Sequence, residues 1–249
     1  MEVYYYTEKG KRVKNQDSLL LNSKLITSKD MLTLKKYSKI NNKYNKFFIA
    51  DGMGGYNKGE LASSSVLKIF KETFKRKFDK ASIIQLVNNS QEYLKYLSLT
   101  QNLENLGTTL SGVFFTTDRN IAFNIGDTRI YKLSSKKIEQ LSYDHSFGME
   151  LVEKKVISKN FLKYHPSKNI LTSTISNNDT FKYLNYKEFS FNINEYIFIC
   201  SDGVWEQLDD SYLIKLLKKE KIFKNICKTI LTLIKKSPND NISFILIKK

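Results

Sequence analysis

Five aspartates stand at the ends of apolar runs, and their types and spacing could do chemistry. In FFIADGMGG, residues 47–55, one carboxylate is followed by three glycines in four residues. The run YIFICSDG, residues 196–203, repeats the arrangement. Because strand ends on one edge of a β-sandwich converge in space, these carboxylates can share one site. The five are Asp17, Asp51, Asp127, Asp202 and Asp240.

The chemistry that such a set could support is the binding of a divalent cation. Converging carboxylates repel one another, and burying them unpaired costs on the order of several kcal/mol each. The donors are all oxygen, without a His or Cys cluster, which favours Mg²⁺ or Mn²⁺ over Zn²⁺. Glycine after an aspartate lets the backbone approach closely, so that a carbonyl can also ligate. One Asp–Gly pair is explained as well by an ordinary turn; five aspartates at strand ends favour a metal site.

The aspartates belong to an ordered series of short motifs that runs from residue 12 to residue 241. The series resembles that of the metal-dependent protein phosphatases of type 2C, the PPM family, in their compact bacterial form. Any one tripeptide is a weak signal, whereas seven in the family's order are a strong one. The motifs are Arg12-x-x-Asn15-Gln16-Asp17, Asp51-Gly52-Met53-Gly54-Gly55, Gly107-Thr108-Thr109, Gly126-Asp127-Thr128-Arg129, Asp144-His145, Ser201-Asp202-Gly203 and Asp240-Asn241.

The resemblance implies a dinuclear Mn²⁺ or Mg²⁺ site at one end of a β-sandwich. In the family, the aspartate that matches Asp51 bridges both metals, and the carbonyl that matches Gly52 ligates one of them. The aspartates that match Asp202 and Asp240 complete one metal site. Asp127 matches a ligand of a third, weaker metal.

The activity implied by the resemblance is hydrolysis of phosphoserine and phosphothreonine in proteins, without a phosphoenzyme. Two divalent cations about 3.5–4 Å apart acidify a bridging water and neutralise the phosphoryl oxygens, which permits in-line attack. Arg12 matches the residue that clamps substrate phosphate, and a guanidinium suits two phosphate oxygens. The alternative for Arg12 is one more solvated charge in the string KGKR. Phosphorylated proteins, including a Ser/Thr kinase and its substrates, are the partners implied.

Two positions depart from the family pattern. Many members have Glu–Asp where this chain has Gln16–Asp17, and glutamine ligates only through a neutral carbonyl oxygen. Either Asp17 and bound waters hold the second metal, or that metal site is weakened. Many eukaryotic members have a histidine at the position of Met53, where it is proposed to protonate the leaving group. A catalytically weak or inactive phosphoprotein-binding protein is therefore the alternative function.

The elements that must position these motifs predict an α+β protein. Strands occur in consecutive runs and helices in separate pairs, which indicates a sheet sandwich with helices outside. The resemblance specifies a four-layer α-β-β-α sandwich with two mostly antiparallel sheets. Helical periodicity covers KGELASSSVLKIFKETFKRKF, ASIIQLVNNSQEYLKYLS and the region from DDSYLIKLL, N-capped by Asp209 or Asp210, to TILTLIKKS. Strands are predicted in LGTTLSGVFFTT, NIAFNIGD, RIYKLSS, FSFNINEYIFICS and NISFILIKK.

A single domain is expected over residues 1–249, because no linker, repeat or low-complexity segment interrupts the sequence. Residues 146–190 combine a helical piece, MELVEKKVISKNFL, with a polar loop. They read as an insertion over one end of the sandwich and match the flap of the family, which is thought to shape substrate choice. His145, beside the Gly126–Asp127 motif, is interpreted as a structural histidine.

The composition narrows the remaining classes of function and partner. The net charge of +16 could indicate nucleic acid or an anionic membrane as a partner, but the lysines are scattered and reflect a compositional bias, which makes nucleic-acid binding unlikely. Cys200 and Cys227 lie in apolar patterns and read as packing residues of a reducing compartment. No stretch reaches the roughly 18 apolar residues of a membrane span. We expect a monomeric cytoplasmic protein.

Overall fold

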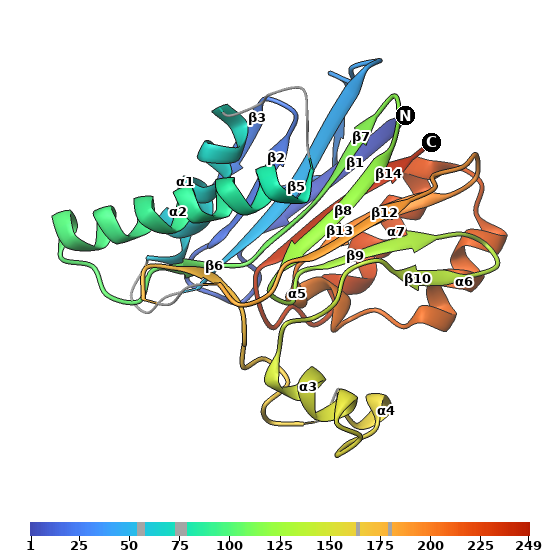
Figure 1. Cartoon of the computed structure of the whole chain (residues 1–249). Helices are drawn as coiled ribbons and strands as arrows, with labels where there is room; N and C mark the ends of the chain where they lie inside the picture. Colours follow the sequence, from blue (N-terminus) through green and yellow to red (C-terminus); the bar gives the residue numbers. More distant parts are fainter. Residues whose placement is uncertain (54–57, 73–78, 163–164, 179–180) are drawn as a thin grey trace.

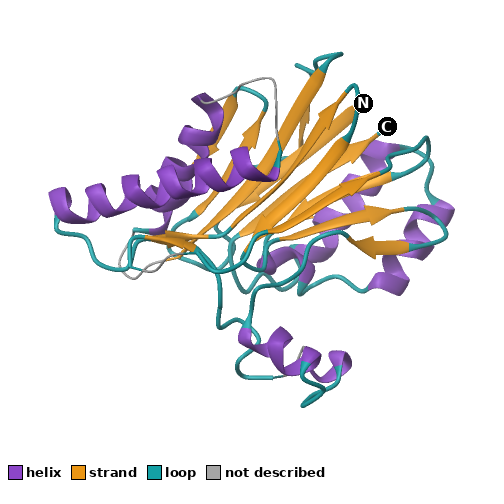
Figure 2. Cartoon of the chain, in the orientation of Figure 1, coloured by secondary structure: helices purple, strands orange, loops and turns teal. Residues whose placement is uncertain are grey.

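The structure is a computed structural model that describes residues 1–53, 58–72, 79–162, 165–178 and 181–249 (Figure 1). Two β-sheets pack face to face, and helices cover their outer faces (Figure 2). Every pairing between the strands that the structure describes is antiparallel. This is the four-layer α-β-β-α arrangement that the sequence predicts.

The first sheet brings the two ends of the chain together. Its six strands have the order β10-β9-β13-β14-β1-β4. The strand β14 therefore pairs with β1, the first strand of the chain, on one side and with β13 on the other. The strands are β1 (Glu2–Glu8), β4 (Lys35–Tyr37), β9 (Arg129–Leu133), β10 (Ile138–Gln140), β13 (Tyr196–Cys200) and β14 (Ile242–Lys248).

The second sheet carries the DG motif on a strand with neighbours on both edges. Its order is β11-β6-β5-β7-β8-β12, and β2, with β3 beyond it, also pairs with β5. The strands are β2 (Asp17–Leu21), β3 (Lys24–Thr27), β5 (Tyr44–Met53), β6 (Gly107–Thr108), β7 (Leu110–Thr116), β8 (Asn120–Ile125), β11 (Ile175–Ser176) and β12 (Asn185–Phe189).

One helix pair packs on each sheet. On the second sheet, α1 (Gly59–Glu72) places Phe70 against Phe48 of β5, with ring centroids 5.7 Å apart. Beside it, α2 (Lys80–Gln101) starts at the N-cap Asp79 and ends at Asn102, which has left-handed backbone geometry. On the first sheet lie α6 (Asp210–Lys219) and α7 (Phe223–Ile234). Phe223 packs edge-on against Tyr4 of β1 at 5.4 Å.

Three shorter helices lie near the end of the sandwich where the aspartate motifs gather. The single turn α5 (Asp202–Trp205) directly follows β13. The helices α3 (Phe147–Glu153) and α4 (Lys159–Leu162) extend away from the sheets in Figure 1. None of the helices in the described ranges is both long and apolar enough to cross a lipid bilayer.

The space between the sheets changes from apolar to polar along its length. Side chains alternate across a strand, so residues two apart share a face. On β5, Phe47 and Ile49 belong to the core between the sheets, whereas Phe48 faces α1 and α2. The alternation places Asp51 on the same face as Ile49, at the point where the apolar core ends. The register of the strand thus aims this carboxylate into the gap between the sheets.

Several expected elements differ from the structure or extend beyond the residues that it describes. The run FSFNINEYIFICS is not one strand, because a turn around Asn194, with φ of 67°, separates β12 from β13. The helical piece MELVEKKVISKNFL divides into α3 and α4, and Lys155 between them has φ of 56°. The first predicted helix ends at Glu72 as α1, and its remaining residues, 73–78, lie outside the described ranges.

Candidate active site

Asp17 and Asp51 form the centre of the site. Asp17 begins β2 and Asp51 lies near the end of β5, and the two residues are direct partners in the antiparallel register. Asp17 is 1% exposed and accepts a hydrogen bond at Oδ2 from Ser201 Oγ at 3.1 Å. Among the described residues no hydrogen-bond donor reaches Asp17 Oδ1, although this atom is buried.

The backbone around Asp51 is held by neighbouring motifs. The Asp51 amide donates to Thr109 Oγ1 at 3.0 Å, and the Asp51 carbonyl accepts from the Thr109 amide at 2.9 Å. Gly52 donates to the carbonyl of Gln16 at 3.2 Å. A Cβ on Gly52 would lie 2.0 Å from the carbonyl oxygen of Gly59, so only glycine fits at this position. The glycine expected from the DG motif is therefore required by close backbone packing.

The other aspartates reach the same place from segments next to strands of both sheets. Asp202 is the first residue of α5, and the Gly203 amide donates to Asp202 Oδ1 at 2.6 Å. Asp127 follows β8 and is 5% exposed. Asp240 precedes β14. All three line one cleft of about 370 Å³, together with Asp51. The convergence that the sequence predicts is therefore present, except that Asp17 lies behind the cleft wall.

Arg12 reaches the cleft from the opposite end of the sequence. Its guanidinium donates from Nε to Asp240 Oδ1 at 2.8 Å and from Nη2 to Asp240 Oδ2 at 2.5 Å. The hydrogen bond and charge of Asp240, followed by the charges of Asp202 and Asp51, raise the pKa of Arg12. The Arg12 side chain is 60% exposed, so it forms an open edge of the site.

Asn241 holds the segment that carries Arg12. Its Oδ1 accepts from the Gln16 amide at 2.8 Å, and its Nδ2 donates to the carbonyls of Lys9 and Lys14 at 3.0 and 2.9 Å. One amide side chain thus fixes residues on both sides of Arg12.

The carboxylates make the cleft strongly unfavourable for further negative charge. Burial, with the nearby charge of Asp240, raises the pKa of Asp17 to about 6. Burial and the charge of Asp144 raise the pKa of Asp127 to about 7. The pKa values of Asp51 and Asp202 also lie well above the ordinary range, because protein encloses both side chains beside the other acids. Both residues still open onto the cleft.

The donor set fits a hard divalent cation. Carboxylate oxygens surround the cleft, and the buried Asp17 Oδ1 has no other partner in the described structure. Such an ion would offset the repulsion that raises the pKa values of these acids. Within the described ranges, no three His, Cys, Asp or Glu side chains already form a group that could hold an ion.

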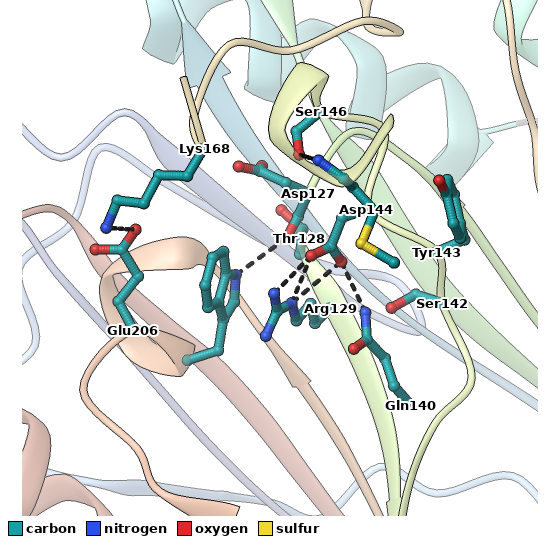
Figure 3. Close-up of polar contacts among 12 residues, drawn as sticks. Asp127, Thr128, Arg129, Gln140, Ser142, Tyr143, Asp144, Ser146, Lys168 and Glu206 are labelled. Carbon is teal, nitrogen blue, oxygen red and sulfur yellow. Dashed lines mark hydrogen bonds and ion pairs between the residues drawn. The ribbon is translucent and has the colours of Figure 1, made fainter. Parts of the chain in front are cut away.

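A buried ion pair supports the Asp127 side of the cleft (Figure 3). Arg129 donates to Asp144 from Nε and Nη2, at 2.9 and 2.6 Å to Oδ2, and stacks 3.5 Å above the ring of Trp205. Trp205 donates from Nε1 to the carbonyl of Asp127 at 3.0 Å. Gln140 donates to the other oxygen of Asp144 at 2.7 Å. The network fixes the backbone of Asp127 to the helical turn that begins at Asp202.

His145 lies outside the cleft and is buried beside the Gly126 motif. It is 3% exposed, and the Gly126 amide donates to its Nδ1 at 3.1 Å. Its own amide donates back to the Gly126 carbonyl at 2.9 Å. Burial lowers the pKa of His145 to about 4, so the ring is neutral at physiological pH.

The site also contains residues for which the sequence predicted no role. Gln16 and Met53, the two positions that depart from the family pattern, line the cleft. Gly54 and Gly55 of the DG motif lie outside the described residues. Three of these residues lie within motifs of the series, so the motifs could have identified them as part of the site: Thr109, Ser201 and Asn241. The remaining lining residues, Asn169 and Leu171, come from the segment after α4 and follow no motif.

Comparison with known proteins identifies the class that this fold and site define. Stp1 from Staphylococcus aureus, a serine/threonine phosphatase, has a TM-score of 0.82 and 24% identity, covering 99% of this chain and 94% of its own. The catalytic domain of the serine/threonine protein phosphatase PstP in complex with two manganese ions has a TM-score of 0.74 and 20% identity, covering 99% and 98%. Both show the same fold.

Sequence comparison specifies the family. The serine/threonine phosphatase stp of Listeria monocytogenes is 27% identical over 217 residues, which cover 81% of this chain and 83% of that protein. The sequence model of protein phosphatase 2C matches residues 30–243. The chain belongs to the protein phosphatase 2C family, as the motif series predicts.

Proposed function

We propose that this protein hydrolyses phosphoserine and phosphothreonine in proteins, using two divalent cations, Mn²⁺ or Mg²⁺. The observation that carries the proposal is the meeting of carboxylates from five separate motifs beside one open guanidinium, within the fold of this family. The catalytic residues in this proposal are Asp51, Asp202, Asp240 and Arg12.

The metal ligands proposed are Asp17, Asp51, the Gly52 carbonyl, Asp202 and Asp240, with Asp127 holding a third, weaker ion. The two manganese ions in the structure of PstP support the number and kind of metals. A divalent cation here would lower the pKa of a bound water and neutralise phosphoryl charge. Asp17 is proposed as a ligand because its buried Oδ1 has no hydrogen-bond partner among the described residues. Its negative charge matters because the neighbouring Gln16 supplies none.

Side chains of the protein position the metal ligands and the substrate phosphate in this proposal. Asp51 is positioned by the Thr109 hydrogen bonds, and Asp202 by the start of α5. Arg12 orients the substrate phosphate through its planar donors, exchanging Asp240 for phosphoryl oxygens. Met53 lines the cleft but cannot donate a proton. The proton for the leaving alkoxide must therefore come from water or from another group in the cleft, so substrates with poor leaving groups are expected to react more slowly.

Hydrolysis of para-nitrophenyl phosphate and of a phosphothreonine peptide tests the proposal, in Mn²⁺ and in EDTA. Wild type should require the metal, and Asp202→Asn should lose at least about 100-fold because a ligand is removed. Asp118→Asn is the matched control, since Asp118 is exposed in the turn after β7. Phosphate release that survives EDTA, or no release from wild type with Mn²⁺ bound, would overturn the proposal.

We further infer that residues 1–249 form one domain, with residues 146–190 as a flap beside the cleft. The stem of this flap contributes Asn169 and Leu171 to the cleft wall, which supports a role in substrate contact. Residues 163–164 and 179–180 of the flap lie outside the described ranges. A kinase partner, a monomeric state and a cytoplasmic location stay predictions from the sequence.

A further inference from the structure

A second cavity, of about 480 Å³, lies at the base of the flap and shares no lining residue with the acidic cleft. We call it the flap-stem cavity. Its walls come from Tyr143 and His145, from the side of α3 that carries Glu150 and Glu153, and from residues 183–185 at the start of β12.

The cavity and the cleft lie on either side of the flap stem. The stem is a short antiparallel pairing in which Ser146 bridges Leu171 and the Thr172 amide donates to the His145 carbonyl at 2.9 Å. Leu171 lines the cleft, and the next residue, Thr172, lines the cavity. A polypeptide with its phosphorylated residue in the cleft therefore needs only a few further residues to reach the cavity.

Two carboxylates on one side of the cavity have no cationic partner. Glu150 and Glu153 are three residues apart, so they share a face of α3. None of the ion pairs between described residues includes either one.

His145 contributes a second, independent signal in the same cavity. Because the Gly126 amide donates to Nδ1, the ring hydrogen is on Nε2. We find no acceptor for Nε2 among the described residues, although the histidine is 97% buried and lines the cavity. A ring N–H at the wall of the cavity can therefore donate to an acceptor of a bound ligand. A ligand of this cavity thus combines a hydrogen-bond acceptor with a positive charge.

We propose that the flap-stem cavity binds a basic residue of the phosphoprotein substrate, close in sequence to the phosphorylated residue. Its ammonium or guanidinium group pairs with Glu150 and Glu153, and a backbone carbonyl of the same segment accepts from His145 Nε2. The inference rests on the proposed function, since it specifies which phosphoproteins the site favours.

The other walls of the cavity suit this occupant. The rings of Tyr143 and Tyr183 both lie near His145, with centroids 5.8 and 5.9 Å from it, and aromatic faces attract cations. Glu153 lies near the Tyr143 hydroxyl: burial first, and then Glu153, raise the pKa of that hydroxyl, yet no hydrogen bond of regular geometry joins them. Lys154 at the end of α3 also lines the cavity, but it is exposed, so its ammonium group can turn to solvent.

Short phosphothreonine peptides in an alanine background, with one arginine moved through each position, test the proposal. At the matching position, arginine should raise kcat/KM of wild type about tenfold, a typical gain for one charge-assisted hydrogen bond. The double variant Glu150→Gln/Glu153→Gln should lose this gain while its rate on para-nitrophenyl phosphate is unchanged. Glu92→Gln/Glu104→Gln, which removes two acids from α2 and the loop after it, should keep the gain.

The result that overturns the inference is a gain from arginine that is equal in wild type and in the flap-stem variant, or absent at every position. If wild type hydrolysed no phosphate ester with Mn²⁺, the proposed function itself would fail. Fluorescence anisotropy of the labelled peptides still decides the inference in that case. Equal affinity for arginine and alanine peptides would exclude it, and tighter binding that depends on Glu150 and Glu153 would support it.

Discussion

Asp17 and Asp51 face each other across neighbouring antiparallel strands, so the fold itself places two carboxylates side by side. The cost of this arrangement appears in the raised pKa values of the acids around the cleft. It should be visible as a pH dependence of folding stability.

Without metal, the protein should become less stable as pH rises from about 4 to about 7. In the folded state the pKa values are about 6 for Asp17 and about 7 for Asp127. An aspartate in the unfolded chain has a pKa of about 3.9. Unfolding therefore releases protons, and the free energy of unfolding falls through this window. Thermal unfolding in EDTA, followed across this range, measures the effect.

Divalent cations should remove much of this loss, because they bind the ionised carboxylates. The difference in Tm between samples with Mn²⁺ and samples with EDTA should widen as the pH rises from about 5 to about 7.5. Asp127→Asn should flatten the upper part of the metal-free curve. Parallel curves with and without Mn²⁺ would contradict the metal assignment of these acids.

Arg12→Lys should weaken phosphate binding without unfolding the protein. Lysine keeps the charge but loses the planar pair of donors that Arg12 now directs at Asp240. The inhibition constant for inorganic phosphate should rise about tenfold, a typical loss for one charge-assisted hydrogen bond. Lys11→Ala, at an exposed neighbour, should leave it unchanged. An unaltered inhibition constant in Arg12→Lys would rule out Arg12 as the phosphate clamp.

Asn241→Ala should both destabilise the protein and lower activity. The substitution removes one acceptor and two donors that hold the segment from Lys9 to Gln16. The free energy of unfolding should fall by about 1–3 kcal/mol, since the backbone groups lose their partners. Urea unfolding measures the loss, and KM for a phosphopeptide should rise because Arg12 is carried by the same segment. Asn239→Ala, at an exposed position, is the control that should show neither change.

Asp144→Asn should cost about 3–5 kcal/mol of stability, because it leaves the guanidinium of Arg129 buried without its counter-charge. The side chains of Arg129 and Asp144 are only 15% and 5% exposed, so solvent screens the pair little. Urea unfolding of the metal-free protein measures the effect. Replacing both partners, as in Arg129→Met/Asp144→Leu, should recover part of the loss. A single-variant cost below about 1 kcal/mol would show that the pair contributes no more than a surface ion pair.

The sequence was informative where a short pattern carries its own geometry. The apolar run that ends at Asp51 predicted a strand with this carboxylate near its end, and β5 ends two residues later. Asp209 caps α6, one of the two positions expected to do so. The convergence of the aspartates followed from their positions at strand ends, and the structure confirms it for the four that line the cleft.

Contacts between distant parts of the chain were beyond that reasoning. Arg12 and Asp240 are 228 positions apart, and no local pattern indicates that their side chains meet. The division of the flap helix at Lys155 depends on a left-handed backbone at a residue type that rarely adopts it. Asn169 and Leu171 join the cleft wall only because the flap stem folds back on itself, which tertiary packing decides.

The pairing of β14 between β13 and β1 also bears on how the protein is made. The ribosome makes β1 long before β14, the strand that pairs with it over seven residues and lies more than 230 positions later. Until β14 has been made, the nascent chain therefore presents an incomplete sheet, and such exposed strand edges favour misassembly. Closure of the sheet coincides with delivery of Asp240, so the cleft gains its full set of acids in the same late event that completes the fold.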